Sequence, residues 1–532
     1  MRRDSAFGPY TSEPLEDAAA RQEKGAGASH PSAVFTRIAW LLIIFGIVLR
    51  LGQYIANRSL WLDESVLALS IAGRSFRGLL EPLDYSQIAP IGFVMLEKLA
   101  VKLFGTNEYA LRLVPITAGI GSVLLFYRVA KQCLNERALL VAMCLFCASE
   151  PLIYYASEVK QYSSDVLVAV AILWPTIRSL QQGLVARRYV GLALIGAVAV
   201  WFSFPAVFIL AGSGIALAAR EAWEGRRRSM YKVLAVASIW ALSFAINYRL
   251  FGKGNDVMVS YWEWAFAPLP TSGEGLLWYF KAAFRSMRDL FGPPSALPDL
   301  GPALSGLALV AALAGIGSFF EIRRWILAAL LIPVALTLFA SALKLYPFAG
   351  RTVLFLDSIF FLLVAAGAQE RPLDGRRLTR IAKWATAVLV LAPMAAATVG
   401  LIKRPGHQET RAALNHLGER SRAGDLVYMY PGFQPSVEYY RRFSKIAGLS
   451  ELQFLEGDPA QWPTFDGELR RLRGHSRVWI LFCHTKGERG LDDRAVLLSV
   501  LDQKGKRLDE FNATGASTYL YDLSLPGGSD GR

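Results

Sequence analysis

The chain has 532 residues, of which 53% are hydrophobic and 19% are charged, and its formal net charge at pH 7 is +14. Soluble globular domains carry about 25% charged residues, and the apolar residues here come in long blocks, so the composition excludes a soluble protein with one large core and indicates a polytopic membrane protein. The positive charge is then expected to mark the cytoplasmic side of a membrane, and no nucleic acid is expected as a partner.

The N-terminal residues 1–34 precede the first apolar block. They are rich in Ala, Gly and charged residues and lack the apolar core of a signal peptide, which predicts a flexible cytoplasmic tail. The first apolar block covers residues 35–53 and is followed by the sequence WLDES, in which Asp63 and Glu64 lie side by side. The next segment, residues 90–105, contains three charged residues and reaches only about 24 Å as a helix, so it is expected to lie at the membrane interface as an amphipathic helix.

Ten further apolar segments follow along the chain. They lie near residues 110–130, 137–155, 164–181, 189–203, 205–220, 231–250, 302–320, 325–341, 352–368 and 381–401. When residues 90–105 are left out of the count, every cluster of Lys and Arg between segments falls on one side, as the positive-inside rule requires. The sequence therefore predicts about 11 transmembrane helices within residues 35–402, with residues 54–109 and 251–301 as outer loops.

The character of the chain changes after residue 403. Residues 410–420 and 436–443 have the pattern of helices, and three short runs are typical of β-strands. The runs are residues 425–430, 477–483 and 517–523. We predict an extracytoplasmic α/β domain over residues 404–525, followed by a disordered tail at 526–532. The predicted fold class is thus a polytopic α-helical membrane protein with a C-terminal α/β domain.

The predicted topology brings ionisable residues from three outer segments to one face of the membrane. They are Asp63 and Glu64 after the first span, Glu158, Lys160 and Tyr162 after the third, and Tyr346 and Arg351 before the tenth. Any one such carboxylate is more often simply solvated, but several costly charges on one face indicate a functional site. A carboxylate can act as a general base toward an acceptor, and fixed cations can stabilise the charge on a departing phosphate. The combination suggests sugar transfer from a lipid phosphate.

The order of these motifs resembles that of the integral-membrane C-type (GT-C) glycosyltransferases. The acidic pair is followed by a predicted interfacial helix that ends in LFG, then by NEYALRLVPITAGIGSVLLFYRVA and by YYASEVKQY. Further on come YPFAGRTVLFL and AGDLVYMYPGFQPSVEYY, so the resemblance covers roughly residues 35–440. The branches that the sequence resembles most are the bacterial relatives of the protein O-mannosyltransferases and the lipid A aminoarabinose transferases.

The resemblance implies a hexosyl- or pentosyltransferase that moves a sugar from a polyprenyl-phosphate donor to an extracytoplasmic acceptor with inversion. The acceptor could be a lipid, a polysaccharide or a protein. The implied location is a bacterial inner membrane, with the active site and the C-terminal domain facing the periplasm. A multipass transporter or a flippase for lipid-linked saccharides remains the alternative, although the spans carry few charges and show no internal repeat.

The resemblance also implies roles for individual residues. Asp63 matches the acid that engages the acceptor as base, and Glu64 and Glu158 match two further catalytic acids. Arg112, at the start of the second span, matches an arginine that is expected to be structural. Residues implied in binding the donor phosphate are Lys160, Arg351, Tyr162 and Tyr346. Possible contacts to sugar or acceptor are Gln87, where some relatives have a cation, and Trp262 and Trp264.

No pattern in the sequence indicates a cofactor. Metal-ligand spacings, a phosphate-binding loop and a dinucleotide fingerprint are missing from the sequence. We expect that no cofactor is required; a divalent metal is possible, since some C-type enzymes use one, but it is not indicated. Cys144 and Cys147 form a C-x-x-C pair inside an apolar segment, where small buried side chains are the expected role.

Overall fold

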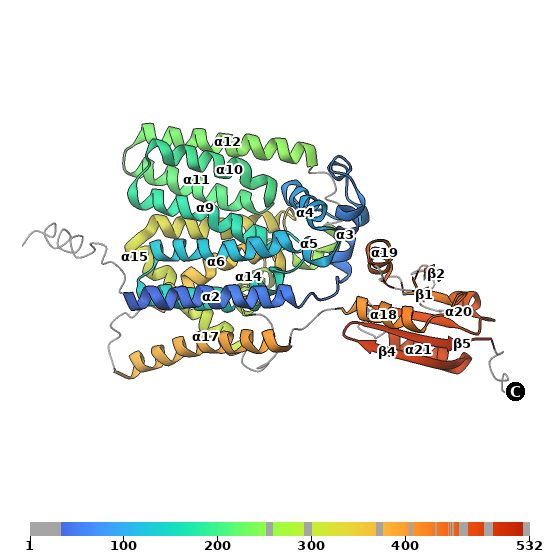
Figure 1. The fold of residues 1–532 in the computed structure, drawn as a ribbon. Helices are drawn as coiled ribbons and strands as arrows, with labels where there is room; N and C mark the ends of the chain where they lie inside the picture. Colours follow the sequence, from blue (N-terminus) through green and yellow to red (C-terminus); the bar gives the residue numbers. More distant parts are fainter. Residues whose placement is uncertain are drawn as a thin grey trace, which may run out of the picture.

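The computed structural model shows a bundle of long helices with a small sheet domain at one end (Figure 1). It describes residues 33–251, 259–291, 301–368, 376–403, 408–430, 433–444, 446, 448–449, 452–456, 466–483 and 493–524. The predicted tails at 1–34 and 526–532 lie almost entirely outside the described residues.

Among the described residues, eight segments are long and apolar enough to cross a membrane. They are α2 (Ala33–Ile55), α6 (Leu113–Cys133), α9 (Tyr162–Gln182), α11 (Ala206–Trp223), α12 (Arg227–Phe251), α15 (Gly301–Ala342), the 3-10 turn η5 (Gly350–Leu356) with α16 (Asp357–Gly367), and α17 (Arg376–Lys403). The shorter helices α7 (Glu136–Ala148) and α10 (Ala186–Phe202) coincide with two further predicted spans. The backbone of α15 leaves helical geometry at Arg323, where two predicted spans meet. Each predicted span is therefore helical, and the count of 11 crossings stays a prediction.

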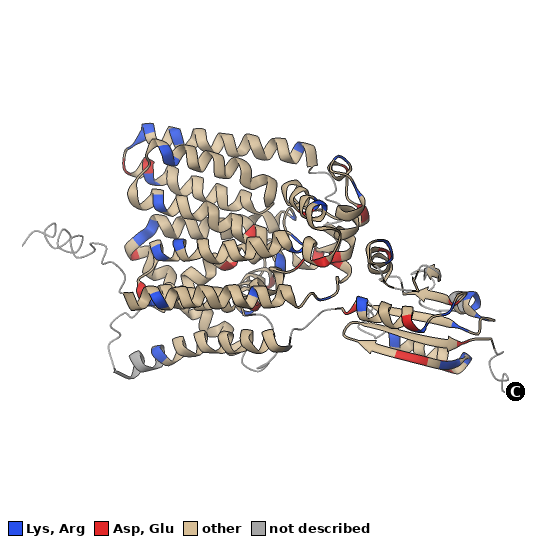
Figure 2. Cartoon of the chain, viewed as in Figure 1, with Lys and Arg blue, Asp and Glu red and all other residues tan. Residues whose placement is uncertain are grey.

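The connections at the two ends of the bundle differ in charge. Lys and Arg gather at the end that lies away from the sheet domain (Figure 2). The links between α9 and α10 and between α11 and α12 lie at this end. Gln181 and Arg323 both donate to the carbonyl oxygen of Gln132, so the end of α6 and the bend of α15 lie beside the end of α9. The opposite end holds short helices, most of them within residues 54–109, the first predicted outer loop. These are α3 (Leu62–Gly73), η1 (Gly78–Leu80), η2 (Asp84–Ser86), α4 (Ile91–Phe104), α5 (Glu108–Leu111) and α8 (Glu150–Tyr155).

The C-terminal part is the predicted α/β domain. Its sheet has the order β2-β1-β3-β5-β4, in which β1 is parallel to β2 and β3, and β5 is antiparallel to β3 and β4. The strands are β1 (Leu426–Met429), β2 (Gln453–Glu456), β3 (Val478–Cys483), β4 (Lys506–Ala513) and β5 (Ala516–Asp522). The helices are α18 (Thr410–Arg420), α19 (Gln434–Phe443), α20 (Asp466–Leu472) and α21 (Asp493–Lys504). The three predicted strands are β1, β3 and β5, which are the buried ones.

The sheet domain and the first outer loop share one apolar core. Leu67 of α3 and Phe93 of α4 belong to the same buried cluster as Val437 of α19 and Trp479 of β3. Burial of apolar surface between segments more than 300 residues apart in the chain fixes the sheet domain on the end of the bundle.

Helices α15 and α16 approach each other through glycine. A Cβ atom at Gly315 would lie 1.9 Å from the carbonyl oxygen of Leu363, and one at Gly367 would lie 1.8 Å from that of Ala311. Small residues allow such close backbone contact, which supports helix association in a membrane, where apolar burial alone gives no driving force.

Replacement of Gly315 by valine should therefore separate α15 from α16. A clash with backbone cannot be relieved by a rotamer change, so we expect a loss of about 3 kcal/mol or more. The measurement is the apparent unfolding temperature of the purified protein in detergent. Gly317→Val is the matched control, because a Cβ there meets no described atom within 4 Å; equal unfolding temperatures for the two variants would contradict the packing argument.

Candidate active site

Three segments at one end of the helix bundle meet at one carboxylate. Lys160 Nζ lies 2.9 Å from Asp63 Oδ1, and Arg351 Nη2 lies 2.7 Å from Asp63 Oδ2. Asp63 is in the first turn of α3, Lys160 in the turn between α8 and α9, and Arg351 in η5. Lys160 also donates a hydrogen bond of 2.6 Å to Gln87 Oε1, just after η2. We call Asp63, Lys160 and Arg351 the ion triad.

The ion triad controls the charge of Asp63. Burial alone would raise the pKa of this carboxyl, but attraction by Lys160 and then Arg351 outweighs it and lowers the pKa below the usual range. Asp63 is thus a carboxylate at neutral pH, and it is a weak base as long as both cations stay beside it. A group that displaced the cations would make Asp63 more basic.

Aromatic rings surround the third member of the triad. The guanidinium carbon of Arg351 lies 5.6 Å from the ring centre of Trp61, 5.5 Å from that of Tyr162 and 5.7 Å from that of Trp262. The rings come from three segments and attract the cation through their faces, and the side chain of Arg351 is 13% exposed. Trp262 is 9% exposed, whereas Trp264 is 64% exposed. The structure therefore places Trp262 in the site and Trp264 at its periphery.

Glu64, the neighbour of Asp63, has a different environment. It is fully buried and forms a two-pronged ion pair with Arg112, with Nε–Oε1 at 3.0 Å and Nη2–Oε2 at 2.8 Å. The backbone N–H of Val159 also donates to Glu64 Oε1 at 3.0 Å. Both oxygens are occupied by the protein itself. Glu64 therefore ties the first outer loop to the start of α6 and to the turn that carries Lys160.

Arg112 also binds the backbone just before the acidic pair. Its guanidinium also donates to the carbonyl oxygens of Arg58 at 2.7 Å and Ser59 at 3.4 Å. The role expected for Arg112 from the sequence, a structural one, agrees with these contacts.

Glu158 is a fully buried acid beside the ion triad. It has no exposed surface, and neither carboxylate oxygen has a hydrogen-bond partner among the described residues. Burial, and then repulsion from Glu64, raise the pKa of Glu158 to about 7, against the attraction of Arg58 and Arg351. Glu158 can thus change its charge near neutral pH beside the ion triad.

Tyr346 supports the backbone beneath Arg351. Its hydroxyl donates to the carbonyl oxygen of Thr352 at 2.7 Å, and its ring packs edge-on against Phe208 and Phe355. This geometry gives Tyr346 a role in shaping η5, while Tyr162 is the tyrosine that contacts Arg351.

Arg58 and Trp61 are site residues that the sequence reasoning missed. The guanidinium carbon of Arg58 lies 3.8 Å from the ring centre of Tyr154, and its Nη2 donates to the carbonyl oxygen of Ser157 at 3.0 Å. Arg58 Nε and Nη1 are buried and have no hydrogen-bond partner among the described residues. Arg58 and Trp61 lie just before the acidic pair in the sequence, and this proximity was the only sequence feature that could have indicated them.

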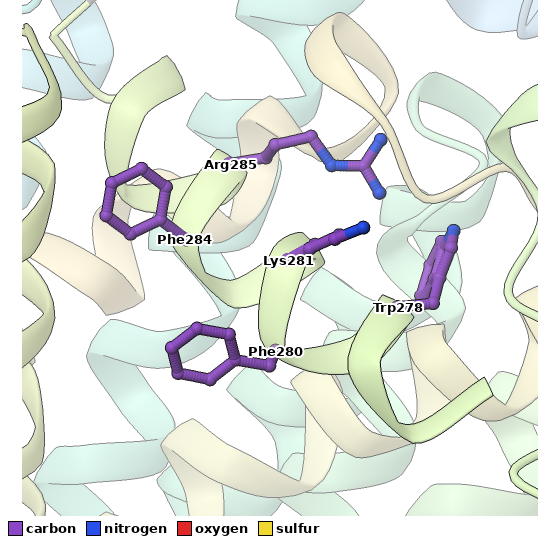
Figure 3. Close-up of a pocket in the computed structure, with 5 residues that line it drawn as sticks. All are labelled: Trp278, Phe280, Lys281, Phe284 and Arg285. Carbon is purple, nitrogen blue, oxygen red and sulfur yellow. The ribbon is translucent and has the colours of Figure 1, made fainter. Parts of the chain in front are cut away.

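Two surface pockets are lined by residues outside the ion triad. One of about 600 Å³ is lined by α14 (Gly273–Asp289) in the long outer loop, where Lys281 and Arg285 extend on the same side as Trp278 (Figure 3). Another of about 610 Å³ is an apolar groove formed largely by α11 and α12. Neither is lined by a member of the triad. Within the described part of the chain, no group of three or more His, Cys, Asp or Glu could hold a metal ion.

Comparison with known proteins agrees with the resemblance noted in the sequence. Residues 89–248 match the family described as dolichyl-phosphate-mannose-protein mannosyltransferase. A search of curated protein sequences finds no significant match.

Solved structures share the fold at low sequence identity. The crystal structure of ArnT from Cupriavidus metallidurans bound to undecaprenyl phosphate matches with a TM-score of 0.51 at 13% identity, over 94% of this chain and 100% of that chain. The apo form of the Archaeoglobus fulgidus oligosaccharyltransferase matches with a TM-score of 0.51 at 12% identity, over 92% of this chain and 75% of that chain. The chain thus has the helical fold of the C-type glycosyltransferases, with a C-terminal sheet domain.

Removal of the Glu64 carboxylate should destabilise the whole protein. Glu64→Gln leaves the buried Arg112 guanidinium without its counter-ion, which typically costs about 3–5 kcal/mol. The expected result is a lower apparent unfolding temperature in detergent. The double variant Glu64→Leu/Arg112→Met should recover much of the loss, because it removes both charges. An unfolding temperature of Glu64→Gln equal to that of the wild type would contradict the structural role.

Proposed function

We propose that this protein is a glycosyltransferase that moves a sugar from a polyprenyl-phosphate donor to an acceptor at the outer face of a membrane. The observation that carries the proposal is the ion triad, in which an acid and two cations from separate outer segments meet at the end of the helix bundle. The matched family and the fold shared with ArnT, whose structure is bound to undecaprenyl phosphate, support the donor class.

The charge distribution supports an outward-facing site. The basic end of the bundle is the cytoplasmic end by the positive-inside rule, and the sheet domain lies at the other end (Figure 2). The site and the sheet domain then face the periplasm of a bacterial inner membrane. Cytosolic sugar nucleotides are not available there, whereas a lipid-borne donor presents its phosphate at the same interface.

The donor phosphate and Asp63 compete for the same cations. A phosphate bound to Lys160 and Arg351 takes over the ion pairs that lower the pKa of Asp63. Donor binding thereby makes Asp63 a stronger base, so that it can deprotonate an acceptor once the sugar is in the site. The mechanism predicts that the donor binds before the acceptor.

The transfer itself is a single displacement. The acceptor hydroxyl or amine loses its proton to Asp63 as its oxygen or nitrogen attacks the anomeric carbon. The bond from that carbon to the phosphate oxygen breaks, and its electron pair leaves with the lipid phosphate, whose new charge Lys160 and Arg351 stabilise. Attack from the side opposite to the leaving group inverts the anomeric configuration. Trp262 and Gln87 border the triad, where they can contact the sugar.

The sugar can be a hexose or a pentose, and the acceptor a lipid, a glycan or a protein. The mechanism uses only side chains of this chain, and no cofactor is required for it. A flippase with the same fold would bind the lipid phosphate but would not break its bond to the sugar.

Transfer of sugar by the wild type distinguishes a transferase from a flippase, and replacement of Asp63 by asparagine tests the base. We expect Asp63→Asn to lose transfer, measured with a radiolabelled polyprenyl-phosphate sugar in proteoliposomes, because the base is gone. The same variant should bind undecaprenyl phosphate about tenfold more tightly, a change of about 1.4 kcal/mol, because the competing carboxylate no longer occupies the cations.

The control for Asp63→Asn is Asp502→Asn, which removes a carboxylate paired with Arg507 in the sheet domain. It should leave both measurements unchanged. Normal transfer by Asp63→Asn would remove the base from the mechanism, and weaker lipid binding would contradict the competition for the cations.

Glu158 should make donor binding depend on pH. Its pKa of about 7 means that it is neutral below pH 7 and negative above. The negative form repels a phosphate beside Arg351, so the affinity for undecaprenyl phosphate should fall as the pH rises from 6 to 8. Glu158→Gln should weaken this dependence.

A phosphate monoester titrates in the same range, with a pKa of about 6, so the informative quantity is the difference between Glu158→Gln and the wild type in parallel titrations. Identical pH profiles would show that Glu158 keeps one charge state throughout.

A further inference from the structure

Hydrogen bonds connect the sheet domain to the segment that carries Asp63. Ser59 Oγ donates to Glu409 Oε2 at 3.0 Å, and the backbone N–H of Arg411 donates back to Ser59 Oγ at 3.1 Å. Arg411 also pairs with Glu108 at 2.8 Å. These contacts fix the chain just before the acidic pair, across about 350 residues of sequence.

Two backbone N–H groups of this segment depend on the sheet domain for their acceptors. The N–H of Leu62, the first residue of α3, donates to Gln408 Oε1 at 3.2 Å. The N–H of Leu60 donates to the hydroxyl of Tyr440 at 2.9 Å. The first turn of a helix has N–H groups without partners in the helix, and a buried N–H without an acceptor is costly. Residues of the sheet domain thus complete the N-terminus of α3.

Helix α19 makes the contact from one side. Tyr440 has no exposed surface, and its hydroxyl also donates to Glu108 Oε1 at 3.2 Å. One turn earlier in α19, the hydroxyl of Ser436 lies 3.1 Å from that of Ser65, and both residues are fully buried. The contacts therefore bracket Asp63, at Leu60 and Leu62 before it and at Ser65 after it.

We propose that the sheet domain is a positioning element for the base of the reaction, with Tyr440 and Gln408 as positioning residues. They hold the first turn of α3 so that the backbone of Asp63 keeps its place beside the site when the donor phosphate takes Lys160 and Arg351 from the carboxylate. The expected effect on kcat rests on the proposed function, whereas the attachment of α3 to the sheet domain does not depend on it.

Tyr440→Phe is the sharpest test, since it removes one hydroxyl and keeps the ring. Tyr439→Phe is the matched control: it lies next to Tyr440 on α19, is also buried, and makes neither of the hydrogen bonds that the Tyr440 hydroxyl forms with Leu60 and Glu108. In full-length protein in proteoliposomes, kcat for sugar transfer should fall about ten- to hundredfold in Tyr440→Phe, since a shift of about 1 Å in a reacting group costs that much.

Two further readouts distinguish positioning from general damage. The affinity for undecaprenyl phosphate should stay unchanged, because Lys160 and Arg351 do not contact Tyr440. Hydrogen–deuterium exchange should rise in peptides that cover residues 57–73 and stay constant in the membrane helices. Tyr439→Phe should match the wild type in all three measurements.

The outcomes are separable from those of the proposed function. If the wild type shows no transfer, the proposed function fails, and the exchange measurement still decides whether the sheet domain holds α3. Equal kcat and equal exchange in Tyr440→Phe and Tyr439→Phe would overturn the positioning role. Increased exchange throughout the protein, with kcat falling in proportion to the folded fraction, would also overturn it.

Discussion

The buried ion pair between Glu64 and Arg112 is the contact on which the site depends. It joins the first turn of α3 to the start of α6, and through Val159 it also holds the turn that carries Lys160. In an interior without water, such a pair is stable only when each atom has a partner, and here both oxygens do. The position of Asp63 relative to Lys160 thus follows from the carboxylate next to it in the sequence.

The two adjacent acids show how burial assigns a role. Glu64 is fully enclosed, and both of its carboxylate oxygens accept hydrogen bonds from the protein. Asp63 points to the junction of the outer segments, and its partners are the side chains of a lysine and an arginine that an anion can bind in its place. Two adjacent carboxylates thus differ in their partners: one is bound by Arg112 and a backbone N–H, and the other by the side chains of Lys160 and Arg351.

Much of the fold was predictable, because apolar blocks and charge asymmetry are strong signals in a membrane protein. The convergence of Asp63, Lys160 and Arg351 followed from topology alone. Strands β2 and β4 were not predicted, since β4 alternates between exposed and half-buried positions and its sequence KRLDEFNA is largely polar. The separation of roles between Asp63 and Glu64, and the contact of α19 with α3, depend on side-chain direction and on tertiary packing, which spacing in the sequence does not encode.

An acid that must exchange its partners needs a backbone that does not move with them. The two cations of the ion triad, Lys160 and Arg351, have long side chains, so a phosphate can replace the carboxylate beside them without a change of fold. The first turn of α3, in contrast, is held by backbone hydrogen bonds to Gln408 and Tyr440 and by a shared apolar core. If the sheet domain were absent, release of Asp63 from its cations would leave the first turn of α3 without these contacts. The carboxylate would then move at the step in which its position matters. The attachment of a soluble-type sheet to the end of a membrane bundle is, on this view, part of the reaction centre.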